Sequence, residues 1–171
     1  MKTRIASFLL TPLFVLTLCA APEEFARTTI GVGSVTADLD KSLAFYTNVV
    51  GMVRTGGFDV NGEFAKKSGL TDGTPFHVEI LRLGEGEDAS EWKLMTFGDR
   101  AKTEKNEYIL DRTGMRYITI MVNDLTPFVE RIKKHNVKLL GDTPTPLGSD
   151  RHFVLIRDPD GTFIELIGPM K

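Results

Sequence analysis

One pattern occurs twice along this chain, and it restricts the fold more than any other feature of the sequence. The first copy has an apolar, β-prone stretch at residues 30–35, followed by an Asp-Leu pair at 38–39. The second copy has a similar stretch at 117–122, followed by an Asp-Leu pair at 124–125. Self-similarity at a fixed spacing is typical of a duplicated structural unit. We therefore predict two copies of one small module.

A helix follows each Asp-Leu pair, because the apolar residues there recur every three or four positions. Asp38 and Asp124 are predicted N-caps, since a short carboxylate accepts hydrogen bonds from the free amides of a first turn. Gly51 and Asn136 suit the left-handed residue that ends a helix. The sequence thus predicts helices between 38 and 51 and between 124 and 136.

Three more strands are expected after each helix. In the first copy they are residues 52–58, 76–83 and 92–97, with an additional segment at 61–73 that holds a short helix near 63–68. In the second copy they are residues 137–140, 152–157 and 162–168. The last two are joined by Asp158-Pro159-Asp160-Gly161, a strong turn signal. Each copy then has the order β-α-β-β-β, which predicts an α+β fold. We expect modules at 29–98 and 116–170, joined by a charged linker at 99–115 and forming one domain.

Composition excludes several classes of protein. The chain is 42% hydrophobic and 26% charged, which is ordinary for a globular domain and argues against disorder. A net charge of -2 gives no electrostatic footprint for nucleic acid, so no nucleic-acid partner is expected. A single cysteine excludes a disulfide framework and any multi-cysteine metal site.

The N-terminus has the features of a secretory signal peptide. Lys2 and Arg4 precede an apolar run at 5–18, and small residues follow it at 19–21. The run is short for a membrane span, so no stable span is expected after processing. We predict a signal peptide at 1–20 and a periplasmic or secreted protein. A lipid anchor at Cys19 is the second interpretation, because Leu18 is not the small residue that such signals favour.

Two motifs resemble those of the vicinal oxygen chelate superfamily, the glyoxalase, bleomycin-resistance and extradiol-dioxygenase group. They are DLDKSLAFY at residues 38–46 and DPDGTFIEL at 158–166. The likeness covers residues 29–170 and implies two βαβββ modules that form a half-open mixed β-barrel around a cleft. It also implies a small-molecule ligand or substrate held between the modules. It is much less specific for activity, because one fold carries many chemistries.

The resemblance also implies four positions for metal ligands, on the first and last strand of each module. They fall here on Gly31, Lys93, Tyr117 and Glu165. Only Glu165 offers a carboxylate, whereas a catalytic metal normally needs about three protein ligands. A lysine ammonium in the same cleft would repel a cation. We therefore expect no cofactor and no metal at these positions, while a divalent metal at another site stays open.

Glu165 and Lys93 allow two interpretations. They could line a polar pocket and orient an anionic or carbonyl ligand. Alternatively, they could form a structural salt bridge in place of the metal. Tyr117 is expected to form a pocket wall, with a hydroxyl able to donate a hydrogen bond to a ligand oxygen.

His77 and His152 are the candidate ligand-binding or catalytic histidines. If the turn at 159–160 has two residues, Val154 lies opposite Glu165 and His152 shares its face, where it could act as a general base. A bulge in that turn would reverse the face. The alternative for both histidines is a structural role with hydrogen bonds to the backbone.

These observations give two main functional hypotheses. The first is an exported protein that binds a small organic ligand between its modules without the usual metal. The second is a lactoylglutathione lyase-like lyase or isomerase, or a dioxygenase, that acts through Glu165 with His152 or His77. A purely structural or interaction role is a third. A homodimer is possible in each case, because related folds complete the barrel within one chain or between two.

Overall fold

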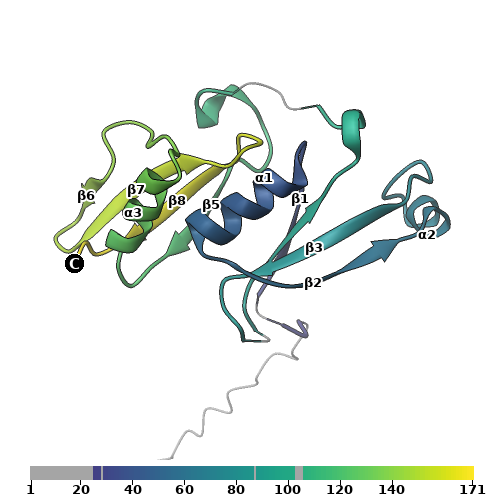
Figure 1. Ribbon diagram of the computed structural model, residues 1–171, viewed down its shortest axis with the longest axis horizontal. Coiled ribbons are helices and arrows are strands. Elements are labelled where there is room, and N and C mark those ends of the chain that lie inside the picture. Colours follow the sequence, from purple (N-terminus) through teal and green to yellow (C-terminus); the bar gives the residue numbers. More distant parts are fainter. Residues whose placement is uncertain (1–24, 28, 87, 103–105) are drawn as a thin grey trace, which may run out of the picture.

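The computed structural model of the protein describes residues 25–171 except 28, 87 and 103–105 (Figure 1). The predicted signal peptide, residues 1–20, lies outside the described residues. No helix among the described residues is long and apolar enough to cross a membrane.

The chain folds into two four-stranded sheets that repeat the same strand order (Figure 1). In each module the first strand is parallel to the last one, and the other neighbouring strands are antiparallel. This arrangement confirms the predicted α+β fold of two modules. The first sheet has the order β1 (Gly31–Val35), β4 (Glu91–Met95), β3 (Phe76–Arg82), β2 (Val53–Val60), and the second has β5 (Tyr117–Met121), β8 (Phe163–Gly168), β7 (Arg151–Arg157), β6 (Thr145–Leu147).

The first long helix begins and ends where the sequence predicts. Asp38 caps α1 (Leu39–Ala44) by accepting a hydrogen bond from the Lys41 amide at 3.1 Å. The helix continues without a break as a π-helical segment, η1 (Phe45–Val50). Gly51 ends it with a φ of +86°, a conformation in which a residue without a Cβ is least strained.

The second long helix, α3 (Thr126–Lys134), starts two residues after Asp124. Leu125 occupies the N-cap position, and Asp124 instead accepts a hydrogen bond from the Thr126 amide at 2.9 Å. The end is as predicted, because Asn136 has a φ of +55°. The short helix α2 (Gly62–Lys67) is also present, with Asn61 as its N-cap.

One predicted strand is wrong. Residues 137–140 form no strand, and only the Leu140 amide bonds toward β7, to the carbonyl of Leu155 at 2.9 Å. The fourth strand of the second module is β6, which pairs with β7 through Thr145 and Phe153. Residues 137–140 instead form part of the connection between α3 and β6.

Both sheets bury one face in a shared core, and a smaller cluster of Val60, Ala65 and Val78 packs α2 against the other face of the first sheet. The long helices cover the core faces, and the shared core explains why two small sheets form one domain. Buried members from the first module include Tyr46, Leu81 and Trp92, and those from the second include Ile132 and Ile164. The rings of Tyr46 and Trp92 lie 5.3 Å apart.

A polar contact joins the first helix to the last hairpin. The Tyr46 hydroxyl donates to the Asp158 carboxylate at 2.7 Å, and the Ser42 hydroxyl donates to Asp160 at 3.0 Å. The amide of Ala37 also donates to Asp160, at 2.9 Å. Burial raises the pKa of Asp158 and that of Tyr46. We call these four side chains, Ser42, Tyr46, Asp158 and Asp160, the helix-hairpin contact.

Candidate functional site

The two sheets place Lys93 and Glu165 at equivalent positions. Gly33 of β1 lies opposite Lys93 of β4, and Thr119 of β5 lies opposite Glu165 of β8. Strand partners point their side chains to the same face of a sheet. Lys93 and Glu165 therefore both lie on the sheet faces opposite the core that the two modules share.

Lys93 takes the space beside Gly31 in the first module. A Cβ added to Gly31 would lie 3.3 Å from the Lys93 Nζ, so the ammonium covers the place where a ligating side chain would start. The same ammonium lies 3.3 Å from Glu91, which also accepts a hydrogen bond from Arg82 at 2.7 Å. These contacts, that of Arg82 first, lower the pKa of Glu91. Module 1 thus presents a carboxylate that is shared by two cations.

In the second module, the Thr119 hydroxyl donates a hydrogen bond to the Glu165 carboxylate at 2.6 Å. Tyr117 lies two residues earlier on β5, on the same face, and is 46% exposed. The structure therefore places Tyr117 and Glu165 on one face of the second sheet. It adds Thr119, which orients the carboxylate.

A cavity of about 240 Å³ lies between the two modules. Three polar residues line it: Ser90 and Glu91 from the first module and Thr119 from the second. Glu91 and Thr119 each contact one of the equivalent side chains, Lys93 or Glu165. Its other walls are mainly apolar, and they include Ile30, Val32, Met52, Leu83, Trp92, Ile118 and Ile120. An apolar cavity with a few placed polar groups is the usual form of a small-molecule site.

The structural salt bridge between Lys93 and Glu165 is not present. Both residues are described, and each has its partner within its own module: Glu91 for Lys93, and Thr119 for Glu165. The two charged groups are therefore separate features of the site.

His152 does not share the face of Glu165, so that expectation is wrong. Leu155 lies opposite Glu165, and His152 lies opposite Gly168 on the face that the helices cover. The connection is longer than two residues because Asp158 accepts hydrogen bonds from the amides of both Asp160 and Thr162, at 3.0 and 2.7 Å. This one-residue change of register moves the histidine away from the candidate site.

His77 also lies on the other face of its sheet. Ile80 is the residue of β3 that lies opposite Lys93, so His77, three positions earlier, points the other way. Its Nδ1 is 2.6 Å from Asp59, and its Nε2 is 3.3 Å from Glu79. The contact with Asp59 is the main reason that the pKa of His77 is raised. Ligand binding by His77 stays a prediction, with its side chain on the face opposite Lys93.

The residues at the four implied metal positions do not fit a metal ion. Glu165 supplies one carboxylate, Gly31 has no side chain, and Lys93 places a positive charge there. Within the described residues, no three His, Cys, Asp or Glu side chains gather closely enough to hold a metal. A divalent cation would find one anionic ligand, Glu165, among these positions and an ammonium group at the equivalent position of the other module.

Most of the chain matches the model of a known protein family. The model of the glyoxalase/bleomycin resistance protein/dioxygenase superfamily matches residues 30–166, which is most of the chain. The chain belongs to this superfamily. Among curated proteins, one relative from this glyoxalase group is a probable lactoylglutathione lyase of Vibrio parahaemolyticus. It is 28% identical over 132 residues, which cover 76% of this chain and 82% of the relative.

Solved glyoxalase structures share the fold. A glyoxalase family protein from Bacillus cereus has a TM-score of 0.69 and 21% identity, over 89% of this chain and 99% of that one. The trypanothione-dependent glyoxalase I of Leishmania major has a TM-score of 0.56 and 23% identity, over 84% and 87% of the two chains. At these identities the likeness concerns the fold alone.

Glu91 and Thr119, two of the polar residues of the cavity wall, were not predicted from the sequence. A signal for Thr119 was available, because a parallel pairing of the first and last strands places it beside Glu165. Glu91 had no comparable signal, since its role depends on the side chains of Arg82 and Lys93.

Proposed function

We propose that this protein binds a small organic molecule in the cavity between its two modules. The observation that carries the proposal is the pair of polar groups, Glu91 and Thr119, that face an otherwise largely apolar cavity from the two halves of the repeat. Lys93 forms an ion pair with Glu91, and Glu165 accepts a hydrogen bond from Thr119. These two contacts hold the polar groups in place. A ligand with an apolar body and one or two polar atoms matches these walls.

The test is a binding screen on the purified protein with two matched variants. Thr119→Val removes the hydroxyl from the cavity wall, and Thr55→Val makes the same change on an exposed strand outside it. We expect Thr119→Val to weaken binding of any metabolite found by up to about tenfold, the usual effect of losing one neutral hydrogen bond. Equal affinity of both variants would contradict the proposed site.

We further propose that the ligand is held without the metal of related enzymes. The lysine ammonium beside Gly31 supports this proposal. Elemental mass spectrometry of protein purified without nickel or chelator should find less than stoichiometric zinc, nickel, manganese and iron. A stoichiometric metal that is lost in Glu165→Gln would overturn the proposal.

An enzyme is the second candidate, because the curated relative is a probable lactoylglutathione lyase. Glu165 would then be the group that transfers a proton, positioned by Thr119, and neither His77 nor His152 would assist it. An assay for formation or cleavage of lactoylglutathione tests this candidate. Turnover that falls at least about 100-fold in Glu165→Gln would favour the enzyme over the binding protein. The dioxygenase alternative is the weaker one, since the donor set does not fit a metal.

We also propose that the protein is exported, on the strength of the charged and apolar pattern at 1–20. Mass spectrometry of protein from its native host should find an N-terminus near residue 21. An intact Met1 would contradict export. Glutathione is an intracellular thiol, so export would also argue against a glutathione-dependent reaction.

A homodimer is proposed on the basis of exposed apolar side chains. Leu110 is 82% exposed and Met121 is 61% exposed, and large apolar side chains left this exposed are candidates for an interface between chains. The turn that carries Leu110 is held by hydrogen bonds from the amides of Glu107 and Tyr108 to Asp111. Light scattering after size exclusion should give twice the chain mass, and Leu110→Glu should give a monomer. A monomer for the unaltered protein would contradict this proposal.

A further inference from the structure

A second cavity lies at the far end of the first module, away from the one between the modules. It has a volume of about 370 Å³ and shares no wall residue with the intermodular cavity. Three apolar residues from separate segments contribute to its wall: Val35 at the end of β1, Leu70 after α2, and Phe97 after β4. Phe97 is held in place by Phe76, whose ring centre is 5.0 Å away. This volume is within the range of small-ligand pockets.

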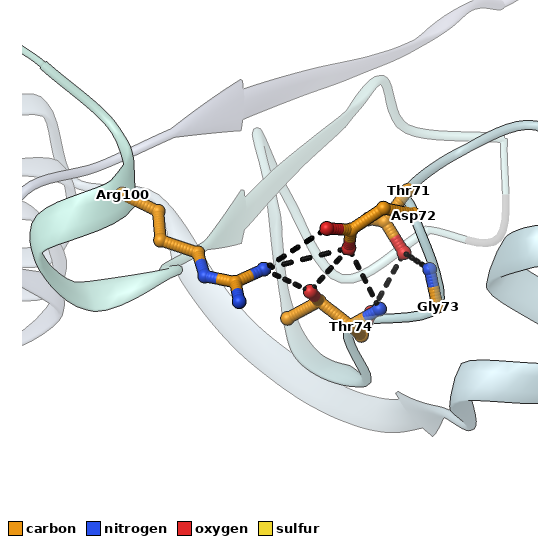
Figure 2. Close-up of polar contacts among 5 residues, drawn as sticks. All are labelled: Thr71, Asp72, Gly73, Thr74 and Arg100. Carbon is orange, nitrogen blue, oxygen red and sulfur yellow. Dashed lines mark hydrogen bonds and ion pairs between the residues drawn. The ribbon is translucent and has the colours of Figure 1, made fainter.

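The polar side of this cavity is a cluster of Asp72, Thr74 and Arg100 (Figure 2). Asp72 accepts hydrogen bonds from the Thr74 hydroxyl at 2.6 Å and from the Thr74 amide at 3.2 Å. These contacts, more than that with Arg100, lower the pKa of Asp72. The carboxylate is therefore satisfied largely by its own loop.

Arg100 is only loosely engaged. Its Nη1 contacts the Thr74 hydroxyl and lies 3.4 Å from each Asp72 oxygen, which is long for a charged hydrogen bond. Among the described residues, no contact uses its Nη2 or Nε, as Figure 2 shows for the residues drawn. The side chains of Arg100 and Asp72 are 65% and 74% exposed, so the pair contributes little to stability.

We propose that this cavity binds a small monocarboxylate with an apolar body. The ligand's carboxylate would accept hydrogen bonds from the Nε and Nη2 groups of Arg100, in the side-by-side geometry that a guanidinium favours. The apolar body would pack against Val35, Leu70 and Phe97. A single negative charge is preferred over a phosphate dianion, because Asp72 is close and repels each further charge.

The probe is 3-phenylpropanoate, titrated into the purified protein and followed by NMR of backbone amides. Shifts are expected at Val35, Leu70 and Phe97. The matched 3-phenylpropanamide lacks the charge and should bind at least about tenfold more weakly. Inorganic phosphate should bind more weakly than the carboxylate. Absence of shifts in this cavity, or tighter binding of phosphate, would overturn the proposal.

Three variants separate this site from a general effect of charge. Arg100→Gln should weaken binding at least about tenfold, and Lys102→Gln, which removes the same charge nearby, should leave it unchanged. Asp72→Asn should strengthen binding about threefold, because it removes the competing carboxylate. A damaged fold cannot produce that gain. Equal losses in Arg100→Gln and Lys102→Gln would contradict a specific site.

The same titration keeps this proposal distinct from the proposed function. Shifts confined to Ile118 and Ile120 would place the probe in the intermodular cavity, which would overturn the second site and support the first. Shifts confined to Val35, Leu70 and Phe97 would support the second site, whatever the outcome of the binding screen.

Discussion

Asp158 accepts hydrogen bonds on both of its carboxylate oxygens. One oxygen receives the amides of Asp160 and Thr162, and the other receives the buried hydroxyl of Tyr46. The first set shapes the last hairpin, and the second ties that hairpin to the first helix. A single side chain thus determines both the register of β8 and its attachment to the other module.

Loss of the Tyr46 hydroxyl should destabilise the whole protein. We expect Tyr46→Phe to lower the free energy of unfolding by about 1.5–3 kcal/mol, the usual range for a hydrogen bond to a charged group. Tyr117→Phe is the control, because that ring is half exposed, and its effect should stay within about 0.5 kcal/mol. Urea denaturation measures both values. Similar values for the two variants would show that the Tyr46 hydroxyl is not specially stabilising.

His77 should titrate above its usual pKa of 6.5. The charged imidazole is stabilised mainly by Asp59, so its contribution to folding is complete below that value and is lost as the pH rises through the raised pKa. Asp59→Asn should lower the pKa of His77, measured from its imidazole NMR signals. The signals of His135 and His152 are internal controls. An unchanged His77 titration would refute the role of Asp59.

At the level of elements, the first helix has sharply defined ends. Asp38 starts it, and Gly51 stops it in the left-handed conformation just after its π-helical part. A side chain at Gly51 would be strained by the backbone, and its Cβ would also lie 3.3 Å from the Arg131 guanidinium. This end positions the chain for β2.

Gly51→Ala should therefore be costly. We expect it to lower the free energy of unfolding by about 1–2 kcal/mol, the cost of the left-handed conformation for a residue with a Cβ. Gly84→Ala is the matched control, because Gly84 has open space around it and no such conformation. Thermal unfolding of the two variants measures the difference. A Gly51→Ala protein as stable as the control would show that the helix end tolerates a side chain.

Three helix ends and the order of elements along each module could be predicted from the sequence because local chemistry decides them, whereas the start of α3 could not, since Leu125 takes the N-cap position expected for Asp124. Asp38 caps the backbone of its own helix, and Gly51 and Asn136 end helices in the left-handed conformation. The sequence repeat indicates that both modules have the same order of elements. The face of His152 could not be predicted, since it depends on how Asp158 folds the turn. The strand expected at 137–140 is also absent. Its apolar residues follow α3 but form no ladder of hydrogen bonds with β7, which the local sequence does not reveal.

On the scale of the whole molecule, the two modules share one core and should unfold together. Trp92 is the sole tryptophan of the chain and reports on the first module. Ile164→Ala truncates a fully buried side chain of the second module and should cost about 2–5 kcal/mol. We expect Trp92 fluorescence and far-UV circular dichroism to show the same shifted midpoint. A fluorescence midpoint that does not move would show independent modules.

The helix-hairpin contact also has an evolutionary consequence. Its four side chains belong to the two motifs that carry the family resemblance, one motif in each half of a duplicated chain. Loss of Asp158 from the second half removes the partner of Tyr46 in the first half, and loss of Asp160 removes that of Ser42. The halves are therefore not free to diverge separately after duplication. A chimera that combines halves from different relatives should fold only when both motifs come from chains in which these pairs are complete.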